Sequence, residues 1–77
     1  MDEKRERQFR ELGLTIAYYR KLKGITQAQL ATKVNLSRTH ISNIEAPKIR
    51  TSLSLESLFD IADALDIPPK DLFNFKT

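Results

Sequence analysis

Apolar residues recur at three- and four-residue steps along this chain, the spacing that places side chains on one side of an α-helix. In the N-terminal segment this spacing sets Phe9, Leu12, Ile16 and Tyr19 in one apolar stripe. Gly24 follows two lysines at the end of the segment and is typical of a helix C-terminus. A second long stripe comprises Leu55, Leu58, Ile61, Ala62 and Leu65. No segment shows the alternation of a β-strand, so the pattern predicts an all-α fold.

Two shorter helices are predicted between these stripes. Thr26 and Gln29 have the spacing of a capping box, in which the hydroxyl and the glutamine side chain bond backbone amides at a helix start. After an interruption at Asn35, Ser37 is suited to cap a third helix from about Arg38 to Glu45.

The second and third helices, over about residues 26–45, have the spacing of a helix-turn-helix. Helices of about eight residues are unstable alone in water, so these two must pack against each other. Ala31 is small where crossing helices approach, Asn35 suits a left-handed turn, and Ile41 faces back into the core. The apolar set is completed by Leu30, Val34, Leu36 and Ile44.

The C-terminal part of the chain predicts two further helices over about residues 54–75. Ser54 is suited to cap the first of them, and Pro68 ends its apolar run. Pro69 fits the first position of a last short helix that extends to Phe73. Because 77 residues suffice for one small core, residues 1–77 are expected to form a single domain of five helices.

These elements resemble the Cro/CI (XRE) family of phage and bacterial DNA-binding repressors. The resemblance covers roughly Leu12 to Phe73 and implies a five-helix, lambda-repressor-like domain. The segment Arg38-Thr39-His40-Ile41-Ser42 is also similar to the recognition helix of small restriction–modification controller proteins. The matching residues are Leu12-Gly13, Ile16, Arg20, Ile25-Thr26-Gln27, Leu30-Ala31, residues 37–45, Leu58 and residues 61–67.

The charge is distributed unevenly, which bears on the partner. Residues 1–25 and 26–50 each carry a formal balance of +3, whereas residues 51–77 carry −3. A basic face suits a polyanion, and an acidic end would stay clear of it. The chain has no cysteine and its first residues are charged, so we expect no disulfide, no signal peptide and a cytoplasmic location. No apolar run is long enough for a membrane span.

The predicted third helix carries the candidate base-reading residues. At 100° per residue its isoleucines define the buried side, and Thr39, Ser42 and Asn43 fall opposite, with Arg38 near the exposed N-terminal end. Side chains of these types can pair with base edges in the major groove of double-stranded DNA. An ordinary solvated face is the alternative interpretation.

The family resemblance implies further roles. It implies that Gln27, at the start of the second helix, contacts a DNA phosphate and could brace Arg38. His40 is expected at the DNA backbone or simply exposed, and Lys48 and Arg50 are expected to meet phosphates where the loop leaves the groove. Arg20 and Glu45 are implied as a structural ion pair between the first and third helices.

A single module of this type reads few base pairs, so we expect a homodimer on a palindromic operator. The candidate interface consists of Ile67, Leu72, Phe73 and Phe75, with Phe59 as a further candidate. The alternative is that these residues only close the core of the domain.

The sequence therefore predicts a sequence-specific DNA-binding transcription regulator, expected to be a repressor that acts mainly by occupying promoter DNA. An antitoxin-like module whose C-terminal part binds a partner protein is the alternative, and a non-specific nucleic-acid coat is a third. The chain offers no nucleophile–base pair and no phosphate-binding glycine loop, so we expect no enzyme activity. With His40 as its only histidine, we expect no metal. No cofactor or small-molecule ligand is expected either.

Overall fold

The computed structural model describes residues 3–46 and 51–75. It contains α1 (Glu3–Lys23), α2 (Gln27–Val34), α3 (Arg38–Glu45), α4 (Leu55–Ala64) and a 3-10 helix, η1 (Pro69–Phe73). The described residues contain no strand, as the all-α prediction required. The predicted count of five helices is not confirmed: the described residues form four α-helices, and the last short segment, which begins at Pro69, is a 3-10 helix.

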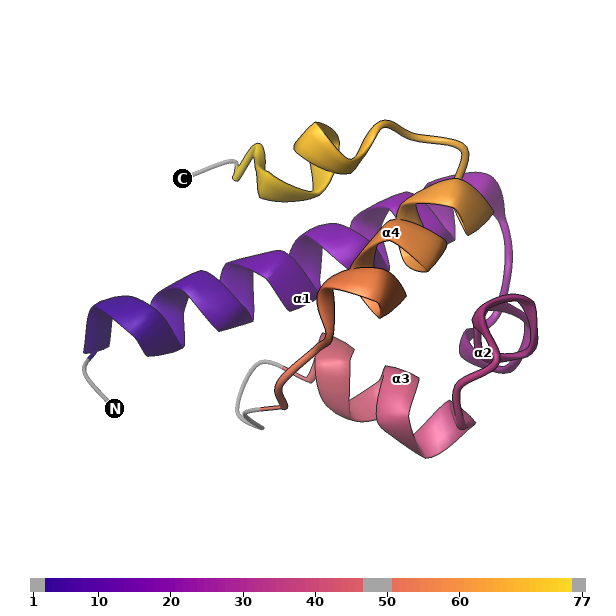
Figure 1. The fold of residues 1–77 in the computed structure, drawn as a ribbon, viewed down its shortest axis with the longest axis horizontal. Helices are drawn as coiled ribbons and strands as arrows, with labels where there is room; N and C mark the ends of the chain where they lie inside the picture. The colour runs from indigo at the N-terminus through magenta and orange to yellow at the C-terminus, as the bar shows by residue number, and fades with distance from the viewer. Residues whose placement is uncertain (1–2, 47–50, 76–77) are drawn as a thin grey trace.

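The helices surround one core, with α1 running along its whole length (Figure 1). Helix α2 packs against both α3 and α4, and α1 packs against α3. The chain returns after α4, so that η1 lies against both α1 and α4. The helix-turn-helix therefore occupies one side of the domain, and the C-terminal segment lies beside the N-terminal half of α1 on another (Figure 1).

Local sequence signals set the helix ends. The capping box at α2 is complete: Thr26 Oγ1 accepts from the Gln29 amide, and Gln29 Oε1 accepts from the Thr26 amide. The hydroxyls of Ser37 and Ser54 cap α3 and α4 in the predicted way. Asn35 adopts φ 57° in the turn between α2 and α3, which confirms the left-handed conformation expected of it.

The core is built mainly from the predicted stripes, but one of the predicted positions differs clearly from the expectation. Leu55 was expected on the inner side of α4, but 63% of its surface is exposed. It is the first residue of α4, directly after the Ser54 cap. The buried apolar residues are Ile16, Leu30, Ala31, Val34, Ile41, Ile44, Leu58, Ile61, Ala62, Leu65 and Leu72.

None of the helices among the described residues is both long and apolar enough to cross a membrane.

Candidate nucleic-acid interface

Helix α3 is held in place by its buried side. Ile41 is fully buried and Ile44 is nearly so, which anchors the helix to the core along one side. At its N-terminus the Ser37 hydroxyl accepts a hydrogen bond of 2.9 Å from the His40 amide. The opposite side of α3 is thereby presented to solvent in a fixed orientation.

The four candidate base-reading residues occupy this outer side. Arg38 and Thr39 are exposed, and Ser42 and Asn43 are partly exposed. Their side chains form no hydrogen bond or ion pair within residues 3–46 and 51–75. None of the four is packed beneath its neighbours, so the structure leaves a guanidinium, two hydroxyls and an amide available on one helix. His40 lies beside them and is partly buried.

Arg20 and Glu45 form a buried ion pair that ties α1 to α3. The Nε atom of Arg20 donates to Glu45 Oε2 at 2.7 Å, and Nη2 donates to Oε1 at 3.0 Å. Each residue exposes only 8% of its surface. The remaining nitrogen, Nη1, donates to the carbonyl of Ile25 at 2.8 Å, in the connection before α2. This bidentate pair therefore joins three segments of the chain.

Gln27 joins the same network. Its Nε2 atom donates to Glu45 Oε1 at 2.9 Å. The side chain therefore bonds Glu45 and not Arg38, the residue that it was predicted to brace. The Nε2 donor of Gln27 needs an acceptor, which the Glu45 carboxylate supplies and the Arg38 guanidinium does not. The bond was not predictable from the sequence, because residues 18 positions apart come into contact here only where α2 packs against α3.

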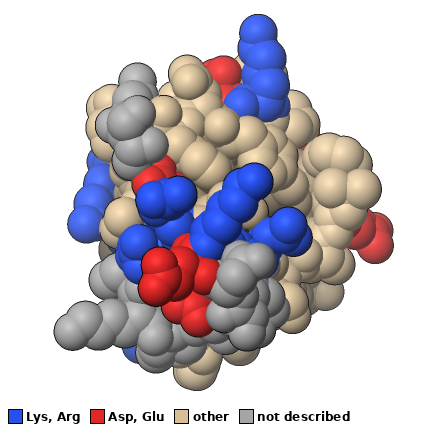
Figure 2. Space-filling view, turned by 90° about the vertical axis from the view of Figure 1, so that its left-hand side faces the viewer, with Lys and Arg blue, Asp and Glu red and all other residues tan. Residues whose placement is uncertain are grey.

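Two candidate phosphate contacts cannot be placed. Lys48 and Arg50 belong to residues 47–50, which lie outside the described residues. A group of charges also lies on the described part of the chain. Lys and Arg side chains gather with acidic ones on the face that Figure 2 shows, at the end of the molecule where α1 begins. The first turns of α1 supply Lys4, Arg5, Arg7 and Arg10, all exposed.

The four candidate interface residues do not share one surface. Leu72 was proposed at a dimer interface, which is wrong: it is fully buried and packs in the core of its own chain. Phe73 is 53% exposed, and Ile67 and Phe75 are partly buried. Adjacent residues of a 3-10 helix point about 120° apart, and which of them is covered depends on where η1 packs against α1 and α4, so the sequence pattern could not separate the buried Leu72 from the exposed Phe73.

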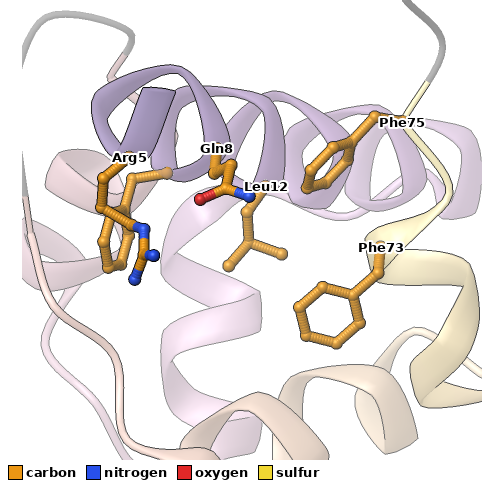
Figure 3. Close-up of a pocket in the computed structure, with 6 residues that line it drawn as sticks. Arg5, Gln8, Leu12, Phe73 and Phe75 are labelled. Atoms are coloured by element: carbon orange, nitrogen blue, oxygen red, sulfur yellow. The ribbon is translucent and has the colours of Figure 1, made fainter. Parts of the chain in front are cut away.

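Phe73 and Phe75 line a groove between the C-terminal segment and α1 (Figure 3). The groove has a volume of about 370 Å³, and Arg5, Gln8 and Leu12 contribute to its α1 wall. Figure 3 shows the rings of Phe73 and Phe75 on the opposite side of the groove from Arg5. The groove was not predicted, because it forms between segments that are some sixty residues apart in the sequence.

No group of three or more His, Cys, Asp or Glu side chains within the described ranges is arranged to hold a metal ion.

Comparison with known proteins identifies the class. A helix-turn-helix family model matches residues 16–72. Control protein C.BamHI from Bacillus amyloliquefaciens is 40% identical over 53 residues, which are 69% of this chain and 63% of that protein. The matched segment thus spans slightly less than two thirds of that relative.

Two solved structures support the same assignment. The restriction-modification controller protein C.AhdI from Aeromonas hydrophila superposes with a TM-score of 0.78 at 31% identity, covering 84% of this chain and 96% of that one. The N-terminal DNA binding domain of SinR from Bacillus subtilis gives a TM-score of 0.76 at 30% identity, covering 87% of this chain and 96% of that one. The fold and the exposed α3 thus define a helix-turn-helix protein of the class that regulates transcription. The chain belongs to the XRE-type helix-turn-helix family.

Proposed function

We propose that this protein is a sequence-specific DNA-binding transcription regulator that inserts α3 into the major groove. The single observation that carries the proposal is the outer side of α3. Four polar side chains, Arg38, Thr39, Ser42 and Asn43, remain accessible there on a helix whose other side is locked into the core. Arginine can bond guanine and asparagine can bond adenine through paired hydrogen bonds.

The start of α2 is the proposed phosphate contact. Free backbone amides and the helix dipole favour an anion at a helix N-terminus. The Gln27 side-chain amide uses one N–H for Glu45 and has a second N–H to donate. Because Glu45 belongs to α3, this bond sets the distance between the phosphate contact and the base-reading helix. Contacts of this kind fix the register of a protein on the duplex.

The protein is proposed to act as a homodimer on a palindromic operator and to repress by occupying promoter DNA. Two-fold pairing suits this docking mode, because each subunit reads one half-site. The accessible aromatic residues of the acidic C-terminal third, Phe59 and Phe73, support an interface there. One of the relatives reported above, C.AhdI, is a restriction-modification controller protein, which supports control of such genes as the regulatory context.

Selection of bound sequences from random duplex DNA tests the proposal. We expect a preferred site with two-fold symmetry. Asn43→Ala should weaken that site by about 1–3 kcal/mol while leaving random duplex binding nearly unchanged, because an amide pair to a base is lost. Asn74→Ala is the matched control, since Asn74 is an exposed asparagine just beyond η1, the last helix. Equal loss on cognate and random DNA for Asn43→Ala would refute base reading by α3.

A further inference from the structure

Helix α1 carries a second apolar stripe, on the side away from the core. Leu14, Tyr18 and Leu22 follow one another at four-residue steps and are 48%, 53% and 69% exposed. The described residues include only three other large apolar side chains with comparable exposure. Scattered exposed apolar residues are common, but three in register on one helix form a continuous surface.

This stripe takes no part in the helix packing described above. The core side of α1 is formed by Ile16 together with Leu12 and Tyr19. At 100° per residue, Leu14 and Tyr18 fall almost opposite Ile16. Arg20, which reaches Glu45 in α3, also lies on the core side. The stripe therefore faces away from α3 and stays accessible when α3 is occupied.

The charges beside the stripe indicate what it can bind. Arg10 and Lys21 are exposed on one flank of the stripe, and both are cationic, whereas the partly buried Glu11 lies in line with the stripe at its N-terminal end. Two antiparallel copies of α1, paired about a two-fold axis, would bring this flank against the same flank of the other copy. Like charges opposed in this way disfavour self-association. An acidic flank in the partner would instead be attracted to Arg10 and Lys21.

We propose that Leu14, Tyr18 and Leu22 form a docking surface for an amphipathic helix of another protein, one that carries acidic residues beside its apolar stripe. The partner buries the α1 stripe, and its acidic residues meet Arg10 and Lys21. This mode is an ordinary helix–helix packing driven by apolar burial, with charge supplying specificity. The surface is separate from α3, so the inference does not depend on the proposed function.

Two synthetic helical peptides test this surface directly. They share one leucine stripe, and one is flanked by glutamates while the other is flanked by lysines. Titrated into the isotope-labelled full chain, the glutamate peptide should bind about tenfold or more tightly than the lysine peptide. Its binding should shift the NMR signals of Leu14, Tyr18 and Leu22. In the charge-reversed double variant Arg10→Glu/Lys21→Glu, the preference should invert.

Substitution of the stripe supplies the controls. Leu22→Lys should abolish binding of the glutamate peptide, whereas Leu55→Lys, at a similarly exposed leucine of α4, should leave it intact. Tyr18→Gln gives a second test if Leu22→Lys alters the circular dichroism. Equal binding of both peptides, or shifts away from α1, would overturn the inference. Conversion of a dimer to a monomer by Leu22→Lys, measured by sedimentation, would also overturn it, because a second copy would then be the occupant.

These outcomes are distinguishable from failure of the proposed function. Operator binding is measured separately for each variant, and we expect it to remain within about twofold of the unchanged protein, because the stripe faces away from α3. Loss of operator binding by Asn43→Ala with intact peptide binding would leave the α1 inference standing.

Discussion

The backbone of Gly13 in α1 lies directly against the carbonyl oxygen of Ile44 near the end of α3. A Cβ atom at position 13 would lie 2.0 Å from that oxygen and 3.2 Å from the carbonyl carbon. Both neighbours are backbone atoms, which cannot rotate away as a side chain could. The approach of α1 to α3 therefore depends on the absence of a side chain at this position.

We expect Gly13→Ala to destabilise the protein by about 1–3 kcal/mol or more, as overpacking of a close contact does. In an open helix the same change would stabilise by about 1 kcal/mol, because alanine is the better helix former. The free energy of unfolding, measured by urea titration, shows whether Gly13→Ala lowers or raises the stability of the protein. Gly24→Ala is a comparison with a different cause: its Cβ would meet nothing within 4 Å, so a loss of stability there comes from its φ of 79° and not from a clash. Greater stability of Gly13→Ala would show that the helices separate easily.

Removal of one partner of the buried Arg20–Glu45 ion pair is expected to lower the stability much more than removal of both partners. Glu45→Ala leaves the Arg20 guanidinium buried without a counter-charge, which costs about 3–5 kcal/mol. The double variant Arg20→Met/Glu45→Met should lose much less, because it buries no unpaired charge. Thermal unfolding of the single and double variants measures the difference. A double variant as unstable as Glu45→Ala would show that the pair itself supplies the stability.

Acidic pH is expected to weaken a second, exposed ion pair between Lys23 and Asp66. The hydrogen bond from Lys23, and then its charge, hold the pKa of Asp66 below the usual 3.8. Because the folded state favours the ionised carboxylate, this stabilisation is fully present above about pH 3.8. It is lost as the pH falls through the lower pKa of the folded protein. The effect is small, since the Asp66 side chain is 77% exposed and salt screens the pair.

The variant Asp66→Asn isolates this contribution. Asp66 has φ 58°, and asparagine tolerates this left-handed conformation, so the backbone is kept while the charge is removed. The stability difference between the unchanged protein and Asp66→Asn should be positive near neutral pH and should vanish in acid. Chemical denaturation across this range measures it. If the stability difference between the two proteins stays constant as the pH is lowered, the effect does not come from the charge of the Asp66 carboxylate.

Much of the fold was predictable because the deciding interactions are local. The capping box at Thr26, the left-handed turn at Asn35 and the cap at Ser37 depend on residues within four positions of one another. The repeat of Ile41 and Ile44 was enough to place the outer side of α3, and with it the candidate base-reading residues. The sequence also carried enough of the family pattern to indicate the class of protein.

Contacts between distant segments were not predictable in the same way. That Leu72 would be buried and Phe73 exposed depended on where η1 meets α1 and α4. The bond from Gln27 to Glu45 required α2 and α3 to cross at a particular angle. Helix periodicity gives the side of a helix that is apolar, but it does not give the neighbour that covers it. Local backbone preferences thus determined the helices and the turn, whereas the close approach at Gly13, the Glu45 network and the uncovered α1 stripe were decided by how the helices pack in three dimensions.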